Sequence, residues 1–311
     1  ADTYGMDKHQ IIVGNGAAEL LYAICRLPGY TGAFVPAPGF SEYKEALEAS
    51  KIPVRDIFYR PREDDNGKPY FEVPYLALET FAAELKGQDG CIIVFLGNPN
   101  NPDGTLLDKD HIRTVASMLK DANSLLVIDE SFIDFVGNDP LQDNEYSMRS
   151  LVNEFDNIIV VHSFTKFYAV PGLRIGAAFT NETLITQLQQ YIPSWSVNTL
   201  AQAYTKAALN DVDYIKRTKQ ELNEERAFMY NALDAIEGIT VYPPSANFML
   251  FQVNQEGITA NYINEELKKY NMIVRNCDSY VGLTNHWVRI AIKDHDTNIK
   301  LVDKLTDILK V

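Results

Sequence analysis

The feature that most constrains this chain is the alternation of short apolar runs with helix-like segments over residues 11–180. The apolar runs are Ile11-Ile12-Val13, Ala33-Phe34-Val35, 92–96, 125–128 and 158–161, and the helix-like segments cover 17–27, 41–50 and 108–122. Because polar residues hardly interrupt these runs, they are typical of strands that are buried on both faces. The pattern predicts an α/β fold with a mostly parallel sheet between helices.

The pattern changes after residue 193. A long helical segment covers roughly 199–235, and its second half carries many charges. Shorter strand-like and helix-like segments follow up to the end of the chain. A chain of 311 residues has room for two domains. We therefore expect a large domain over 1–195 and a smaller α+β domain over 196–311 that begins with a long connecting helix.

Charge and cysteine content exclude several classes of partner. The formal net charge of −14 argues against nucleic acids and anionic membrane surfaces. No apolar run approaches the roughly 20 residues of a membrane-spanning helix, and the first residues lack a signal-peptide pattern. Cys25, Cys91 and Cys277 are far apart and form no CxxC pair, which indicates reduced thiols. We therefore expect a cytoplasmic protein without a metal, which holds any anionic ligand by a few local cations.

Two hydroxyl groups and two cations follow the strand predicted at 158–161. They are Ser163, Thr165, Lys166 and Arg174. A solvated loop with a surface lysine would account for them. However, apolar residues flank Lys166 on both sides and suggest that its side chain is buried. Loss of hydration lowers the pKa of a lysine and makes its amine a nucleophile suited to a Schiff base. The residues alone leave both interpretations open.

Three further polar clusters follow predicted strands. The segment 97–104 is either a simple rigid turn or a turn that aims an asparagine amide into a cleft. Asp129 ends a buried strand as either a helix cap or the partner of a buried cation. Gly14 and Gly16 precede a helix, whose backbone N–H groups suit a phosphate. Because ligands bind at the carboxyl ends of parallel strands, we expect all these clusters to meet at one edge of the sheet.

The order and spacing of these motifs resemble those of the fold-type I pyridoxal-phosphate (PLP) enzymes, the aminotransferase class I/II superfamily. The matching features are the glycine turn, an aromatic residue after a Pro turn, the NPxNPxG-like segment, the strand-end aspartate, and a Ser-x-Thr-Lys segment with an arginine eight residues after its lysine. The resemblance covers the whole chain. It implies a seven-stranded type of sheet between helices, a smaller carboxy-terminal domain, a PLP cofactor and a homodimer. It also implies that the family segment before the glycine turn is missing.

The resemblance implies a role for each matching residue. Lys166 would form the internal aldimine with PLP, Asp129 would pair with the pyridine nitrogen, and Asn101 would donate a hydrogen bond to the phenolic oxygen. Phe40 would stack on the ring. The cofactor phosphate would be bound by Gly16, Ala17, Ala18, Ser163, Thr165 and Arg174. The substrate would be bound by Arg275, Arg289 and Asn198, with Arg289 holding its carboxylate.

Within the superfamily, the pattern is most similar to the group of threonine-phosphate decarboxylases and histidinol-phosphate aminotransferases. Arg275 matches an arginine for a substrate phosphate, and Phe132 stands where aminotransferases usually carry tyrosine. The resemblance thus implies a PLP-dependent lyase that converts O-phospho-L-threonine to (R)-1-amino-2-propanol phosphate in cobalamin biosynthesis. A class I/II aminotransferase, most similar to histidinol-phosphate aminotransferase, is the alternative. A PLP-binding protein without turnover is a third interpretation, which the intact set of Lys166, Asp129, Arg174 and Arg289 disfavours.

Overall fold

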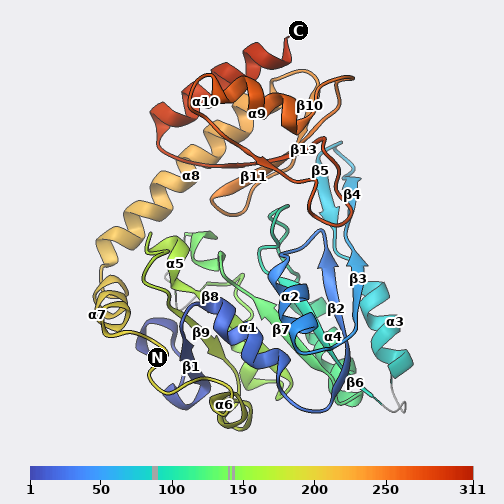
Figure 1. The fold of residues 1–311 in the computed structure, drawn as a ribbon, viewed down its shortest axis with the longest axis vertical. Coiled ribbons are helices and arrows are strands. Elements are labelled where there is room, and N and C mark those ends of the chain that lie inside the picture. The colour runs from blue at the N-terminus through green and yellow to red at the C-terminus, as the bar shows by residue number, and fades with distance from the viewer. Residues whose placement is uncertain (86–89, 139–140, 142–143, 311) are drawn as a thin grey trace.

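A seven-stranded sheet is the main element of the computed structural model, which describes residues 1–85, 90–138, 141 and 144–310. Its strand order is β1-β9-β8-β7-β6-β2-β3 (Figure 1). The strands are β1 (Ile11–Gly14), β2 (Tyr30–Ala37), β3 (Val54–Phe58), β6 (Cys91–Gly97), β7 (Leu125–Asp129), β8 (Ile158–Ser163) and β9 (Gly176–Phe179). Parallel pairing joins β3, β2, β6, β7 and β8, whereas β9 is antiparallel to both β8 and β1. The prediction of a mostly parallel sheet is confirmed.

Helices cover both faces of this sheet. One face packs against α1 (Ala17–Cys25), α2 (Glu42–Ala49) and α6 (Glu182–Gln189). The other face packs against α3 (Tyr75–Leu85), α4 (Lys109–Asp121) and α5 (Phe164–Phe167). Short 3-10 helices lie at Asp2–Tyr4, Lys8–Gln10, Ile133–Phe135 and Arg149–Asn153. The helices expected at 17–27, 41–50 and 108–122 correspond to α1, α2 and α4.

A second sheet contains β10 (Ile239–Val241), β11 (Phe248–Val253), β13 (Trp287–Ala291) and β12 (Arg275–Asn276), and all its pairs are antiparallel. The long helix α8 (Val212–Asp234) leads to it, and α9 (Ala260–Lys268) and α10 (His295–Leu309) pack on it (Figure 1). Its core includes Met229 and Leu233 of α8. Ala201 of α7 (Thr199–Ala208) packs instead into a core of the large sheet. The expected division into 1–195 and 196–311 stays a prediction.

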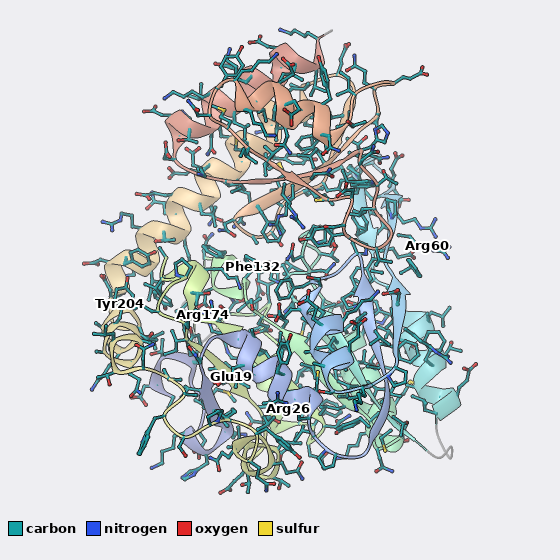
Figure 2. All side chains as sticks on the ribbon, viewed as in Figure 1. Glu19, Arg26, Arg60, Phe132, Arg174 and Tyr204 are labelled. Atoms are coloured by element: carbon teal, nitrogen blue, oxygen red, sulfur yellow. The ribbon has the colours of Figure 1, made fainter. Side chains whose placement is uncertain are left out.

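A hairpin that the sequence did not predict also joins the two sheets. It consists of β4 (Arg60–Glu63) and β5 (Pro69–Glu72). Phe71 is its buried residue, and the centre of the Phe71 ring lies 4.9 Å from that of Tyr242 and 5.5 Å from that of Trp287. Arg60 on the hairpin and Tyr204 on α7 lie on opposite sides of the molecule in Figure 2. The second sheet is therefore held beside the large one both through α7 and α8 and through this hairpin.

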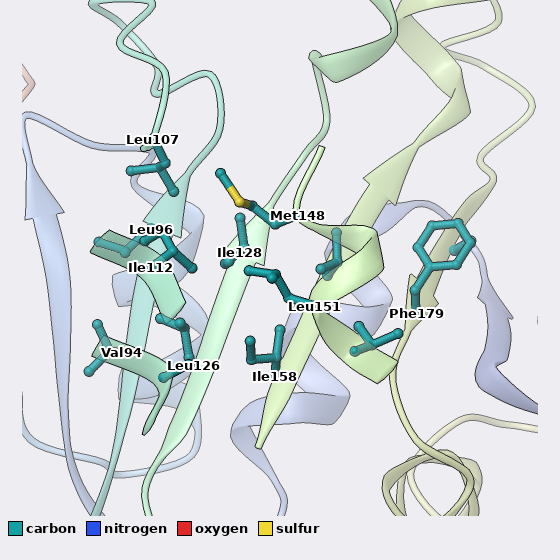
Figure 3. Packing of buried hydrophobic residues seen from close by; sticks show 14 of the residues in the cluster. Val94, Leu96, Leu107, Ile112, Leu126, Ile128, Met148, Leu151, Ile158 and Phe179 are labelled. Atoms are coloured by element: carbon teal, nitrogen blue, oxygen red, sulfur yellow. The ribbon is translucent and has the colours of Figure 1, made fainter. Parts of the chain in front are cut away.

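Alternate residues of the central strands enter different cores, which explains the uninterrupted apolar runs. Along β6, Ile93 and Phe95 pack with α1 and α2, whereas Val94 and Leu96 pack with α4. Figure 3 shows Val94 and Leu96 beside Ile112 of α4. Each of these side chains is removed from water, so no position in the strand favours a polar residue. Polar residues are therefore confined to the strand ends, where the candidate site lies.

Candidate active site

A cavity of about 220 Å³ lies at the carboxyl ends of β6, β7 and β8. Its walls are Phe40, Tyr43, Pro99, Asn101, Asp129, Ser131, Phe132, Lys166 and Arg289. Asn101 follows β6, Asp129 is the last residue of β7, and Lys166 lies in α5 directly after β8. A cavity of about 820 Å³ beside α8 is larger, but its walls contain no residue of these strand-end clusters. The predicted meeting at one edge of the sheet is thus confirmed for the clusters that contain Asn101, Asp129 and Lys166.

Lys166 faces this cavity with an exposed side chain, so the expectation that it is buried is wrong. Its pKa is nevertheless lowered, first because nearby protein removes part of its hydration and second because of the positive charge of Arg174. Asp129 acts in the opposite direction and raises it. The Nζ atom lies 5.0 Å from the centre of the Phe132 ring, an additional favourable contact for the cation. Lys166 thus combines access from the cavity with an amine that loses its proton more easily than usual.

Asp129 is buried at the floor of the cavity. Its Oδ2 accepts a 2.9 Å hydrogen bond from Tyr43 Oη, and its Oδ1 accepts one of 2.9 Å from the backbone N–H of Ser131. Burial, and then the neighbouring carboxylate, raise the pKa of Tyr43, so that its hydroxyl stays a donor. The rings of Phe40 and Tyr43 are nearly perpendicular, and their centres are 5.7 Å apart. Sequence reasoning missed Tyr43, although its place one helical turn after Phe40 was a usable signal.

Asn101 and Arg289 meet on the opposite wall. Arg289 Nη1 donates to Oδ1 of Asn101, and Tyr280 Oη donates to the same oxygen at 3.1 Å. Arg289 also contacts Tyr280 Oη at 3.4 Å, and its guanidinium carbon lies 5.3 Å from the centre of the Phe248 ring. Sequence reasoning placed Asn101 and Arg289 in the site but missed Tyr280.

The glycine turn and Arg174 lie together at the start of α1, where backbone N–H donors and a guanidinium suit an anion. Gly16 has φ +83° and ψ 162°, a conformation that is open essentially only to glycine. A Cβ atom on Gly16 would overlap Nη2 of Arg174, so the guanidinium lies directly over this turn.

The first N–H groups of α1, at Ala17 and Ala18, lack acceptors within the helix. Ser163 Oγ and Thr165 Oγ1 are 2.8 Å apart. Arg174 and Phe132 lie at the edge of the large sheet that faces the second sheet (Figure 2).

These groups fit PLP. Lys166 offers an amine for the aldehyde, Asp129 a carboxylate for the pyridine nitrogen, and Asn101 an amide for the phenolic oxygen. The turn at Gly16, with Arg174 over it, offers a helix start and a guanidinium for the phosphate. Within the described residues, Arg174 forms no ion pair with a carboxylate that would compete with a phosphate.

Arg275 and Asn198 lie outside the walls of the cavity. Arg275 pairs with Arg289 across β12 and β13 and donates to Ser279 Oγ at 2.9 Å. Asn198 caps α7 by accepting from the Ala201 N–H and donates to the Leu173 carbonyl, both at 2.9 Å. Arg275 is therefore next to a wall residue, whereas Asn198 supports the loop that carries Arg174.

Residues 1–85, 90–138, 141 and 144–310 contain no group of three His, Cys, Asp or Glu side chains arranged to hold a metal ion. In the same part of the chain, no helix is both long and apolar enough to cross a membrane. Cys25, Cys91 and Cys277 are free thiols.

Comparison with known proteins agrees with this geometry. Residues 1–305 match the family described as aminotransferase class I and II. The adenosylcobalamin biosynthesis bifunctional protein CobDQ of Leptospira interrogans is 31% identical over 98% of this chain, which spans 33% of that protein. The threonine-phosphate decarboxylase of Salmonella typhimurium is 31% identical over 96% of this chain and 77% of its own length. The histidinol-phosphate aminotransferase structure from Clostridium acetobutylicum superposes with a TM-score of 0.84 at 26% identity, over 97% of this chain and 84% of that one. The chain therefore belongs to the aminotransferase class I and II family and is a PLP-dependent enzyme.

Proposed function

We propose that this chain decarboxylates O-phospho-L-threonine to (R)-1-amino-2-propanol phosphate, a step of cobalamin biosynthesis. One observation carries the proposal: Arg275 and Arg289 are directly opposite each other on neighbouring strands, so their side chains share one face of the second sheet. Among the described residues, neither guanidinium forms an ion pair with a carboxylate. Two such cations beside the cavity suit a substrate with both a carboxylate and a phosphate, since guanidinium binds each of these groups through paired N–H donors.

Each polar group of PLP would have a partner among the residues of the cavity and of the glycine turn. Lys166 would bind PLP covalently, Asp129 would keep a proton on its pyridine nitrogen, and Asn101 would donate to its phenolic oxygen. Gly16, Ala17, Ala18, Ser163, Thr165 and Arg174 would bind its phosphate, and Phe40 would stack on its ring. When bound, PLP supplies an electron sink for the pair that remains at the substrate α-carbon after one of its bonds breaks.

Arg289 and Arg275 then select which bond breaks. Arg289 binds the α-carboxylate and Arg275 the phosphate, so the substrate is fixed at both ends and the torsion at its α-carbon is set. As the bond between the α-carbon and the carboxylate breaks, CO₂ leaves and the electron pair stays at the α-carbon. Lys166, whose amine would be free once the substrate amine has taken its place on the cofactor, would deliver a proton from its ammonium form to that carbon, and its lowered pKa makes the transfer easier.

Phe132 favours decarboxylation over transamination. Its ring faces Lys166 and carries no hydroxyl, at the position where aminotransferases of the family usually place a tyrosine. The threonine-phosphate decarboxylases of Salmonella typhimurium and Caldanaerobacter subterraneus, the latter named putative, add support at 31% and 30% identity. The likeness to the Clostridium structure supports the second candidate function, an aminotransferase acting on histidinol phosphate.

The products distinguish the two reactions. The PLP-loaded protein is incubated with O-phospho-L-threonine and no keto acid, and CO₂ and the amine product are measured. A decarboxylase releases both in equal amounts. A protein that releases no CO₂, but forms glutamate from 2-oxoglutarate and histidinol phosphate, is the aminotransferase.

We further propose that the chain forms a homodimer in the cytoplasm, with a domain division between residues 195 and 196. Trp195 is 96% exposed and Leu200 72% exposed, which supports an interface near this division. The free thiols support a reducing compartment. Sedimentation of the wild-type chain and of Trp195→Ser tests the interface. If Trp195 is buried between the two subunits of the dimer, its replacement by serine shifts the equilibrium toward monomer.

A further inference from the structure

Tyr280 lies where three of the proposed functional side chains meet. Its Oη is 3.1 Å from Oδ1 of Asn101 and 3.4 Å from Nη1 of Arg289. The centre of its ring is 5.7 Å from the guanidinium carbon of Arg275. A single half-buried residue thus contacts the candidate cofactor amide, the candidate carboxylate arginine and the candidate phosphate arginine.

The hydrogen bonds around Asn101 fix the orientation of its amide. An arginine has only donors, so the Asn101 atom that Arg289 contacts must be the oxygen. The Tyr280 hydroxyl accepts from Arg289 and therefore directs its own proton to the same oxygen. Both lone pairs of Oδ1 are then used. The Nδ2 group of Asn101 has no partner among the described residues and remains available as a donor to the cavity.

The ring of Tyr280 lies beside a pair of like charges. Arg275 and Arg289 are cross-strand partners, and like charges in this position destabilise a sheet. The face of an aromatic ring attracts a guanidinium, so the Tyr280 ring favours a position of Arg275 away from Arg289. The spacing of the two cations therefore depends on this tyrosine.

We propose that Tyr280 is a positioning residue of the active site. Its hydroxyl orients the Asn101 amide toward the cofactor, and its ring places Arg275 for the phosphate of the substrate. The part about the ring rests on the proposed phosphorylated substrate, whereas the part about the hydroxyl requires only PLP.

Tyr280→Phe tests the hydroxyl. The PLP-loaded protein is titrated with base in the absence of substrate, and the visible absorbance reports the proton shared between Lys166 and the phenolic oxygen. A donor at that oxygen stabilises the deprotonated form, so weakening the Asn101 donor raises the midpoint, by roughly half a pH unit. The control is Tyr270→Phe, whose ring also lies near a cation, Lys304 at 4.6 Å, but outside the cavity. A midpoint unchanged from wild type in Tyr280→Phe overturns the role of the hydroxyl.

Tyr280→Leu tests the ring. Binding of O-phospho-L-threonine and of L-threonine is read from the change in cofactor absorbance. The test therefore does not depend on whether the bound ligand is decarboxylated or transaminated. Relative to Tyr280→Phe, which lacks the same hydroxyl but keeps the ring, we expect the half-saturation concentration of the phosphorylated ligand to rise roughly two- to fivefold and that of L-threonine to stay unchanged. Equal effects on both ligands overturn the role of the ring. If wild type itself shows no preference for the phosphorylated ligand, the proposed substrate class and the role of the ring both fail, while the pH titration still decides the role of the hydroxyl.

Discussion

Replacing Gly16 by alanine tests the proposed phosphate site with a single added methyl group. Two separate effects follow from the structure. First, alanine disfavours the backbone conformation of this residue, with φ +83° and ψ 162°. Second, the new Cβ atom would overlap Nη2 of Arg174 and lie 3.0 Å from its Cζ, so the guanidinium must move away. The first effect acts on folding, whereas the second acts on ligand binding.

The two effects have different expected magnitudes. A residue held in such a backbone region lowers the free energy of unfolding by about 1–3 kcal/mol. A guanidinium moved off the phosphate gives up hydrogen bonds to a charged group, worth about 1.5–3 kcal/mol. That loss corresponds to a roughly 10- to 100-fold weaker affinity for PLP. We therefore expect Gly16→Ala to unfold at a lower temperature without PLP and to bind PLP much more weakly.

The assay is a titration of the apo-protein with PLP, followed by visible absorbance, together with thermal unfolding of the apo-protein. Gly67→Ala is the matched control, because Gly67 also has a positive φ of +76° but a Cβ there would meet no atom within 4 Å. The control is expected to lose stability and to keep its PLP affinity. If folded Gly16→Ala binds PLP as tightly as wild type, Arg174 and this turn do not form the phosphate site.

Three further predictions concern the cofactor. Lys166→Ala is expected to lose both the absorbance of covalently bound PLP and all turnover, and activity retained in this variant would refute the assignment of the lysine. Arg174→Gln is expected to raise the pKa of Lys166, because the positive charge of Arg174 lowers that pKa in the wild-type chain. The rate of PLP attachment to the apo-protein is measured against pH, and in this variant it should reach its plateau at a higher pH. Phe132→Tyr is expected to lower the pH midpoint of the cofactor absorbance by roughly 0.7 unit, because the new hydroxyl would donate one hydrogen bond of ~1 kcal/mol to the phenolic oxygen. Superimposable titration curves for the variant and the wild type would show that residue 132 does not face that oxygen.

The sequence predicted the central strands because each is buried on both faces. Runs such as 92–96 and 125–128 leave no position for a polar residue, so their burial can be read directly. The edge strand β3 was missed because it carries Arg55 and Asp56, and Ile57 is the one buried residue of its five. The hairpin of β4 and β5 was missed for the same reason: all four residues of β4 are exposed. The reversed direction of β9 depends on how the chain returns after Lys166, which no local pattern encodes.

The site residues at strand ends were predictable because parallel topology brings such positions together. Lys166, Asp129 and Asn101 needed only the sheet to become neighbours. Tyr43 and Tyr280 act through contacts with residues 86 and 179 positions away, and nothing in their own surroundings marks those partners. The exposure of Lys166 was missed for a related reason. Its apolar neighbours Phe164 and Phe167 are buried in the core, whereas the cavity that the lysine faces is formed by other strands.

Local charge, rather than net charge, decides which anions this acidic chain can bind. The net charge is −14, yet Arg174, Arg275 and Arg289 form no ion pair with a carboxylate among the described residues. Arg174 and Arg289 instead contact neutral acceptors, the carbonyl of Pro171 and the amide oxygen of Asn101. A neutral acceptor leaves the full positive charge for a ligand, whereas solvated carboxylates beyond the Debye length of ~8 Å are largely screened at physiological ionic strength. At the proposed phosphate and carboxylate sites, affinity therefore depends on keeping acidic side chains away from these three guanidinium groups. A single aspartate placed beside one of them is expected to weaken binding more than many added on the outer surface.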